Sequence, residues 1–118
     1  MRQARSIVTI ERVEVRGSKA VLRLTGRMDV ESAASFEPAC ESCISEGFTI
    51  LVIDVGDLTY ISSNGLRSII SVAKKLTEKG GELRICGPTG LVRQVFEITK
   101  LSQVFPMHET VESALMDS

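Results

Sequence analysis

An almost continuous run of apolar and β-branched residues, FTILVIDV at 48–55, constrains the fold most strongly. A strand that is hydrophobic at nearly every position needs cover on both of its faces. That requirement is typical of a central strand in a parallel sheet with helices packed on it. The run therefore predicts an α/β fold.

The residues before this run predict a β-hairpin. Residues 7–15 alternate between apolar and other side chains, with a one-residue slip that a β-bulge would absorb. Residues 16–19 supply a turn, and residues 20–25 form a second strand that we expect Gly26 to end.

Helices and strands alternate in the remainder of the chain. Apolar spacing of 3.6 residues indicates helices, and short β-branched runs indicate strands. The order predicts one α/β domain, residues 1–118, with a mixed sheet of four to five strands and about four helices. The expected helices cover residues 31–46, 64–79, 91–99 and 109–116, and the expected further strands cover residues 82–86 and 104–107.

The sequence predicts further details of two of the helices. Pro38 falls within the first helical pattern, and because an interior proline costs about 3 kcal/mol, we expect it in the first turn. In the third helix, the spacing of Leu91, Val95 and Ile98 predicts that these three side chains face the core.

Composition excludes several classes of protein. The 118 residues carry a net charge of −1 with acids and bases intermixed, and only 4% are aromatic, so a nucleic-acid surface is not expected. No apolar run approaches the ~20 residues that span a membrane, and the N-terminus lacks a secretory signal. Three cysteines do not suggest a disulfide framework. We expect a reduced, cytoplasmic protein with no membrane partner.

The sequence contains no motif that is typical of a known class of active site. The single histidine, His108, lies near the C-terminus without a recognisable nucleophile, and GPTG at 87–90 fits a strand-to-helix turn better than a phosphate cradle. Cys40 and Cys43 could begin a zinc site, but a second pair of ligands is missing, which favours two half-buried thiols. We therefore expect no enzyme activity, no metal and no cofactor.

Asp54 and Asp57 allow two interpretations. They lie three residues apart around Gly56, at the predicted end of the central strand. Acids in a turn commonly accept hydrogen bonds from backbone amides, and this interpretation is favoured over a metal site because no third carboxylate lies within reach by sequence.

The hinge TYISSNGL at 59–66 is more informative. Ser62, Ser63 and Asn64 are all good helix N-cap residues, although a helix needs only one. Either one of them caps the helix and the others are incidental, or the hinge is a modification site. A helix N-terminus tolerates the charge of a phosphate, so a phosphoserine there would change what the surface binds without unfolding the helix.

Four segments, which together cover nearly the whole chain, follow one another in a recognisable order. They are TGRMDVESA at 25–33, DLTYISSNGLRSII at 57–70, GGELRICG at 80–87 and LVRQVFEITKLSQVFPM at 91–107. These segments resemble the STAS domain, the family of bacterial anti-sigma factor antagonists and their relatives. The most specific segment, at 57–70, matches the usual form D-[LVF]-[ST]-x-[ILVM]-D-S-[STA]-G-L, with Ser62 in place of the second Asp and Asn64 at the small-polar position.

The resemblance implies a partner-switching cycle. Unphosphorylated protein would bind an anti-sigma factor that is also a serine kinase with a histidine-kinase-like ATPase fold. Phosphorylation of Ser63 would release it, and a PP2C-type phosphatase would restore the antagonist. Ser62 is an alternative acceptor of the phosphoryl group. We expect the protein to be a monomer. The implied partner-binding loop consists of Asp29, Ser62, Ser63, Asn64, Gly65, Leu66 and Arg67.

An alternative from a different class is a STAS module that is never phosphorylated and serves as a constitutive subunit of a transport or sensory complex. It predicts that the same loop binds its partner whether or not Ser63 is modified.

Overall fold

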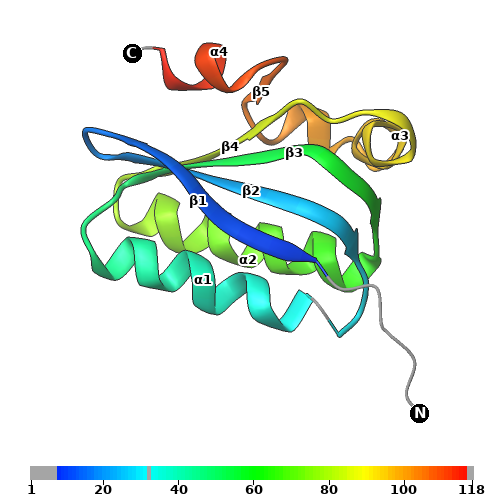
Figure 1. Ribbon diagram of the computed structural model, residues 1–118, viewed down its shortest axis with the longest axis horizontal. Helices are drawn as coiled ribbons and strands as arrows, with labels where there is room; N and C mark the ends of the chain where they lie inside the picture. The colour runs from blue at the N-terminus through cyan, green and yellow to red at the C-terminus, as the bar shows by residue number, and fades with distance from the viewer. Residues whose placement is uncertain (1–7, 32, 117–118) are drawn as a thin grey trace.

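The computed structural model of the protein describes residues 8–31 and 33–116, which form an α/β domain (Figure 1). Five strands form one sheet in the order β1-β2-β3-β4-β5, in which β1 and β2 are antiparallel and the other neighbours are parallel. The predicted α/β class, hairpin and mixed sheet are thus confirmed. The elements are β1 (Thr9–Arg16), β2 (Lys19–Met28), α1 (Ala33–Ser45), β3 (Ile50–Ile61), α2 (Ser63–Glu78), β4 (Glu82–Cys86), α3 (Gly90–Ile98), the 3₁₀ helix η1 (Leu101–Gln103), β5 (Met107–His108) and α4 (Val111–Leu115).

Helices cover both faces of the central strand, as the apolar run 48–55 predicts. Leu51 and Ile53 of β3 point into the main core, on the side of the sheet where α1 and α2 lie (Figure 1). Val52, between them in sequence, points to the opposite face and packs against Ala114 and Leu115 of α4. The alternation of side chains along a strand therefore assigns one set of β3 residues to each layer.

The second strand is longer than the sequence predicts. The expectation that Gly26 ends it is wrong: β2 continues to Met28, and Gly26 lies inside it with φ of 102°. That conformation is available to glycine without steric cost. The local irregularity appears as register shifts against β3, after which Met28 pairs with Ile61. The predicted bulge in β1 is present between Arg12 and Glu14.

Pro38 does not lie in the first turn of α1, as we expected. The helix begins at Ala33, which places Pro38 in its second turn. A proline there removes the hydrogen bond to the carbonyl of Ala34. Both residues are exposed, so water has access to this side of the helix and reduces the cost.

The inward face of α3 also differs from the prediction. Leu91 is 51% exposed and Ile98 is 76% exposed, whereas Val92 and Phe96 are fully buried, and Val95 packs at the edge of the core. The helix is apolar on two sides, and spacing alone does not distinguish them. The Phe96 ring meets Phe105 edge-on with centroids 6.4 Å apart, and burial of a large aromatic side chain outweighs that of an aliphatic one.

The C-terminal elements are shorter than predicted. The strand expected at 104–107 forms only at Met107–His108, and the last helix spans Val111–Leu115. In the described part of the chain, no helix is long and apolar enough to cross a membrane.

The orientation of α3 gives a direct prediction. Phe96→Ala should lower the free energy of unfolding by about 3–5 kcal/mol, because it empties a buried site. Ile98→Ala, two residues away on the exposed side, should change it by no more than about 0.5 kcal/mol. Urea unfolding of both variants measures this, and equal losses would contradict the observed orientation.

Candidate functional site

The two serines of the hinge have different environments. Ser62 is the N-cap of α2: it is extended, only 7% exposed, and its Oγ accepts a hydrogen bond from the Gly65 amide at 3.0 Å. Its own amide donates to the carbonyl of Met28 at 2.9 Å. The Ser62 hydroxyl is thus occupied in holding the first turn of α2.

Ser63 is the first residue of α2, and its side chain is exposed. Its hydroxyl has no hydrogen-bond partner among residues 8–31 and 33–116. The amides of the first turn and the helix dipole favour negative charge at this position. Of the two serines, Ser63 is therefore the one whose hydroxyl can be reached and modified without removing a cap.

Gly65 allows α2 to approach the strand ends closely. A Cβ atom on Gly65 would lie 2.9 Å from Cγ1 of Ile61 and 3.1 Å from Cγ of Met28. Both distances are shorter than ordinary van der Waals contacts. Packing against the ends of β2 and β3 therefore favours glycine at this position of the hinge.

The connection after β2 lies beside the connection after β3. Met28 and Ile61 are the last paired residues of β2 and β3, and the two strands end at the same end of the sheet (Figure 1). Asp29 therefore follows β2 at the end of the sheet where Ser62 caps α2. The Arg27 guanidinium lies over the Tyr60 ring, with its Cζ atom 4.2 Å from the ring centroid, and so joins the ends of β2 and β3 by side chains as well.

The predicted loop residues share this end of the domain but differ in exposure. Ser63 and Arg67 are exposed, and Asp29, Asn64 and Leu66 are half-buried. Ser62 and Gly65 are buried and hold the backbone in place. The exposed and half-buried members can contact another protein directly, whereas the buried pair can act only by positioning them.

An open groove between α1 and α2, with a volume of about 720 Å³, adjoins the loop. Its α1 wall carries the carboxylates of Glu37 and Glu41, and its α2 wall carries Arg67. The sequence alone does not reveal this groove, because the groove depends on how two helices pair. Its lining residues are Val30, Ala34, Glu37, Pro38, Glu41, Asn64, Arg67, Ser68 and Ser71.

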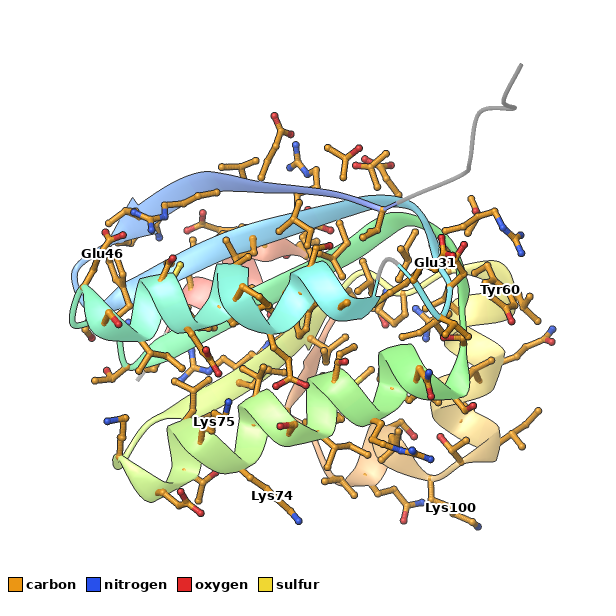
Figure 2. All side chains as sticks on the ribbon, turned by 90° about the horizontal axis from the view of Figure 1, so that it is seen from below. Glu31, Glu46, Tyr60, Lys74, Lys75 and Lys100 are labelled. Carbon is orange, nitrogen blue, oxygen red and sulfur yellow. The ribbon has the colours of Figure 1, made fainter. Side chains whose placement is uncertain are left out.

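Polar contacts of three lining residues hold the two walls of the groove together. Lys75 of α2 forms ion pairs with Glu41 and, at 3.6 Å, with Glu37 of α1 (Figure 2). Ser71 Oγ donates to Glu37 at 3.4 Å. The hydrogen bond to Glu41 raises the pKa of Lys75. These contacts join α1 to α2 beside the groove carboxylates of Glu37 and Glu41.

Asp54 accepts a hydrogen bond from a backbone amide, as the turn interpretation predicts, but it does not lie in a turn. Its carboxylate accepts a hydrogen bond from the Gly56 amide at 3.0 Å and pairs with Arg23 at 3.1 Å. β3 continues past both aspartates to Ile61, so they lie within the strand and not at its end. In residues 8–31 and 33–116, no group of three potential ligands could hold a metal ion.

The remaining candidates have structural roles. The three cysteines are free thiols that are fully buried, more than the half-burial we expected of Cys40 and Cys43. Burial raises the pKa of Cys40, and it raises the pKa of Cys86 to about 12. His108 lies in β5 with Nδ1 at 3.1 Å from Ser113 Oγ. GPTG at 87–90 connects β4 to α3, as predicted.

Comparison with known families decides the assignment. Residues 8–114 match the model of the STAS domain family. The chain belongs to this family. A curated relative, BtrV of Bordetella bronchiseptica, named as a candidate anti-sigma factor antagonist, is 37% identical over 91 residues, which are 77% of this chain and 78% of BtrV. The predicted resemblance to STAS domains is confirmed.

Solved STAS domains share the fold. An anti-sigma factor antagonist from Mycobacterium paratuberculosis superimposes with a TM-score of 0.81 at 24% identity, covering 92% of this chain and 91% of that protein. SpoIIAA in its unphosphorylated form gives 0.79 at 22% identity, covering 91% and 93%. SpoIIAA of Bacillus has also been solved in a phosphorylated form, with a TM-score of 0.72, 21% identity and coverage of 91% and 96%. These similarities show the fold.

The unequal roles of the two serines of this STAS domain can be measured. Ser62→Ala should lower the free energy of unfolding by about 1 kcal/mol, because the first turn of α2 loses its cap. Ser63→Ala should change it by no more than about 0.5 kcal/mol. Chemical denaturation of both variants tests this, and a larger loss from Ser63→Ala would mean that Ser63 caps the helix.

The direction in which Gly65→Ala changes the free energy of unfolding tests the close packing at Gly65. Gly65→Ala should lower the free energy of unfolding by about 1–3 kcal/mol, because the added methyl overpacks the contact with Ile61 and Met28. At an open helical position the same change would raise stability by about 1 kcal/mol. A thermal or urea melt that shows stabilisation would contradict the close approach described above.

Proposed function

We propose that this STAS domain is a cytoplasmic anti-sigma factor antagonist that acts by partner switching, with Ser63 as the phosphorylated residue. The observation that carries the proposal is the contrast between the two serines: Ser63 is exposed at the start of α2, whereas Ser62 is buried as its cap. The names of BtrV and of the anti-sigma F factor antagonist of Paenibacillus polymyxa, 23% identical over 98 residues, support the choice of function.

The cycle has two states. Unphosphorylated protein binds an anti-sigma factor that is also a serine kinase with a histidine-kinase-like ATPase fold. That kinase transfers the γ-phosphoryl group of ATP to Ser63 Oγ, which loses its proton as ADP is formed, and the modified antagonist dissociates. A PP2C-type phosphatase hydrolyses the phosphoserine and returns the protein to its binding state. The protein itself acts by binding and not by turnover, and works as a monomer.

The local structure suits such a switch. A phosphate adds about −1.5 to −2 charges at pH 7. At Ser63 this charge lies next to the free amides of the first turn of α2, where the helix dipole favours it. The buried cap at Ser62 and the packing of Gly65 remain in place. Modification therefore changes the binding surface while the fold persists.

The exposed and half-buried residues of the loop are the proposed contact surface. This surface consists of Ser63 and its neighbours Asp29, Asn64, Leu66 and Arg67, and the adjoining groove extends it between α1 and α2. A partner seated there would bury Ser63. An added phosphate at that point would have to be desolvated, which opposes binding.

Variants of Ser63 test the switch. Ser63→Ala should bind the anti-sigma factor with wild-type affinity, and Ser63→Asp should bind at least ~10-fold more weakly, equivalent to ~1.4 kcal/mol. The partner is first recovered with unphosphorylated protein and purified, and affinities are then measured by calorimetry. Thr77→Asp, which adds the same charge to the exposed far end of α2, is the control and should bind normally.

Equal affinities of Ser63→Ala and Ser63→Asp would overturn the switch. Recovery of a transporter ATPase that binds every variant alike would instead support the constitutive STAS module.

A further inference from the structure

Arg67 differs from the other arginines that the structure describes. Arg12, Arg16 and Arg93 are exposed or half-buried, and each pairs with a glutamate: Arg12 with Glu46, Arg16 with Glu14 and Glu112, and Arg93 with Glu109. Arg23 pairs with Asp54. Within the described residues, the exposed guanidinium of Arg67 has no hydrogen-bond or ion-pair partner.

The position of Arg67 on α2 places it next to Ser63. The two residues are four apart on the same helix, so their side chains are neighbours on one face. Cβ bonds of a helix tilt toward its N-terminus, and a long side chain therefore reaches back over the preceding turn. For Arg67 the preceding turn is the one that begins with Ser63.

We propose that Arg67 is the intramolecular ligand of the phosphate on Ser63, and that phosphorylation withdraws this cation from the partner-binding groove. The inference rests on the proposed function, because it takes Ser63 as the modified residue. A guanidinium can donate two parallel hydrogen bonds to phosphate oxygens, a geometry that a lysine ammonium does not reproduce.

Capture of Arg67 would alter the groove as well as the loop. Arg67 is the basic residue of the groove lining, and Glu37 and Glu41 on the opposite wall already interact with Lys75 and Ser71. In the unmodified protein Arg67 is free to pair with a carboxylate of the partner. In the phosphorylated protein it is held over the first turn of α2, and the groove loses its cation. One modification thus adds an anion and removes a cation from the same surface.

The test needs neither the kinase nor the partner. Phosphoserine is placed at position 63 of the full chain by genetic code expansion, and its phosphate is titrated by ³¹P NMR in the wild-type sequence, Arg67→Gln and Lys74→Gln. Lys74 is a matched control: it is exposed on nearly the same face of α2 but lies 11 residues, roughly 16 Å, from Ser63. Melting temperatures of the unmodified variants confirm that each is folded.

The proposal predicts that the second pKa of the phosphate, about 6 in an isolated phosphoserine, is raised by Arg67→Gln. The expected rise is about 0.5 pH unit, equivalent to ~0.7 kcal/mol of lost pairing. Lys74→Gln should leave the pKa within about 0.1 unit of the wild type. The Arg67 Nε–H signal should also move between unphosphorylated and phosphorylated protein.

Two results would overturn the inference. In the first, the phosphate has the same second pKa in the wild type and in Arg67→Gln. In the second, Lys74→Gln raises this pKa as much as Arg67→Gln does, which would indicate a general effect of positive charge and no specific pair between Arg67 and the phosphate. Both results leave the switch at Ser63 standing, because that claim depends on partner affinity. Conversely, Ser63→Ala and Ser63→Asp could bind the partner equally well while Arg67→Gln still raises the phosphate pKa. That outcome would reject the proposed function and leave the pairing of Arg67 with the phosphate standing.

Discussion

The hydrogen bond from the Ser62 amide to the carbonyl of Met28 links the two strands on which the candidate site depends. It continues the pairing of β2 with β3 to its last residue and places the end of one strand against the start of α2. Because the amide of Ser62 is fixed there, its hydroxyl lies where it can cap the helix at the Gly65 amide. The next residue, Ser63, then turns to the solvent. The accessible serine is thus selected by main-chain geometry.

Packing around this link separates the residues that hold the site from those that can act. Ser62 and Gly65 are buried; the first caps α2 with its hydroxyl, and the second leaves room for the side chains of Ile61 and Met28. Ser63 and Arg67 are exposed and contribute little to the core. The proposed phosphorylation of Ser63 would therefore leave the core and the cap of α2 in place, as a reversible switch requires. The ion pairs between Lys75 and α1 lie farther along α2 and are untouched by such a change.

Sequence patterns predicted the parts of this structure that local chemistry determines. The apolar run at 48–55 identified the central strand and the α/β class, because only a strand covered on both faces has such a pattern. The polar hinge identified the start of α2 to within one residue. The patterns gave wrong predictions where tertiary contacts determine which side chains face the core and where a strand ends. Spacing could not tell that Phe96 and not Ile98 faces the core, or that Gly26 with positive φ would carry β2 onward to the site. Nor could the sequence say which serine is the cap, since both are good N-cap residues.

The proposed switch requires that Ser63 is modified in the living cell. Peptide-mapping mass spectrometry of the protein purified from its native cells, under several growth conditions, measures this modification. We expect a phosphate on Ser63 in a fraction of the molecules that varies with growth condition, and none on the buried hydroxyl of Ser62. A phosphate on Ser62, or no phosphate on this hinge under any condition, would contradict the proposed switch.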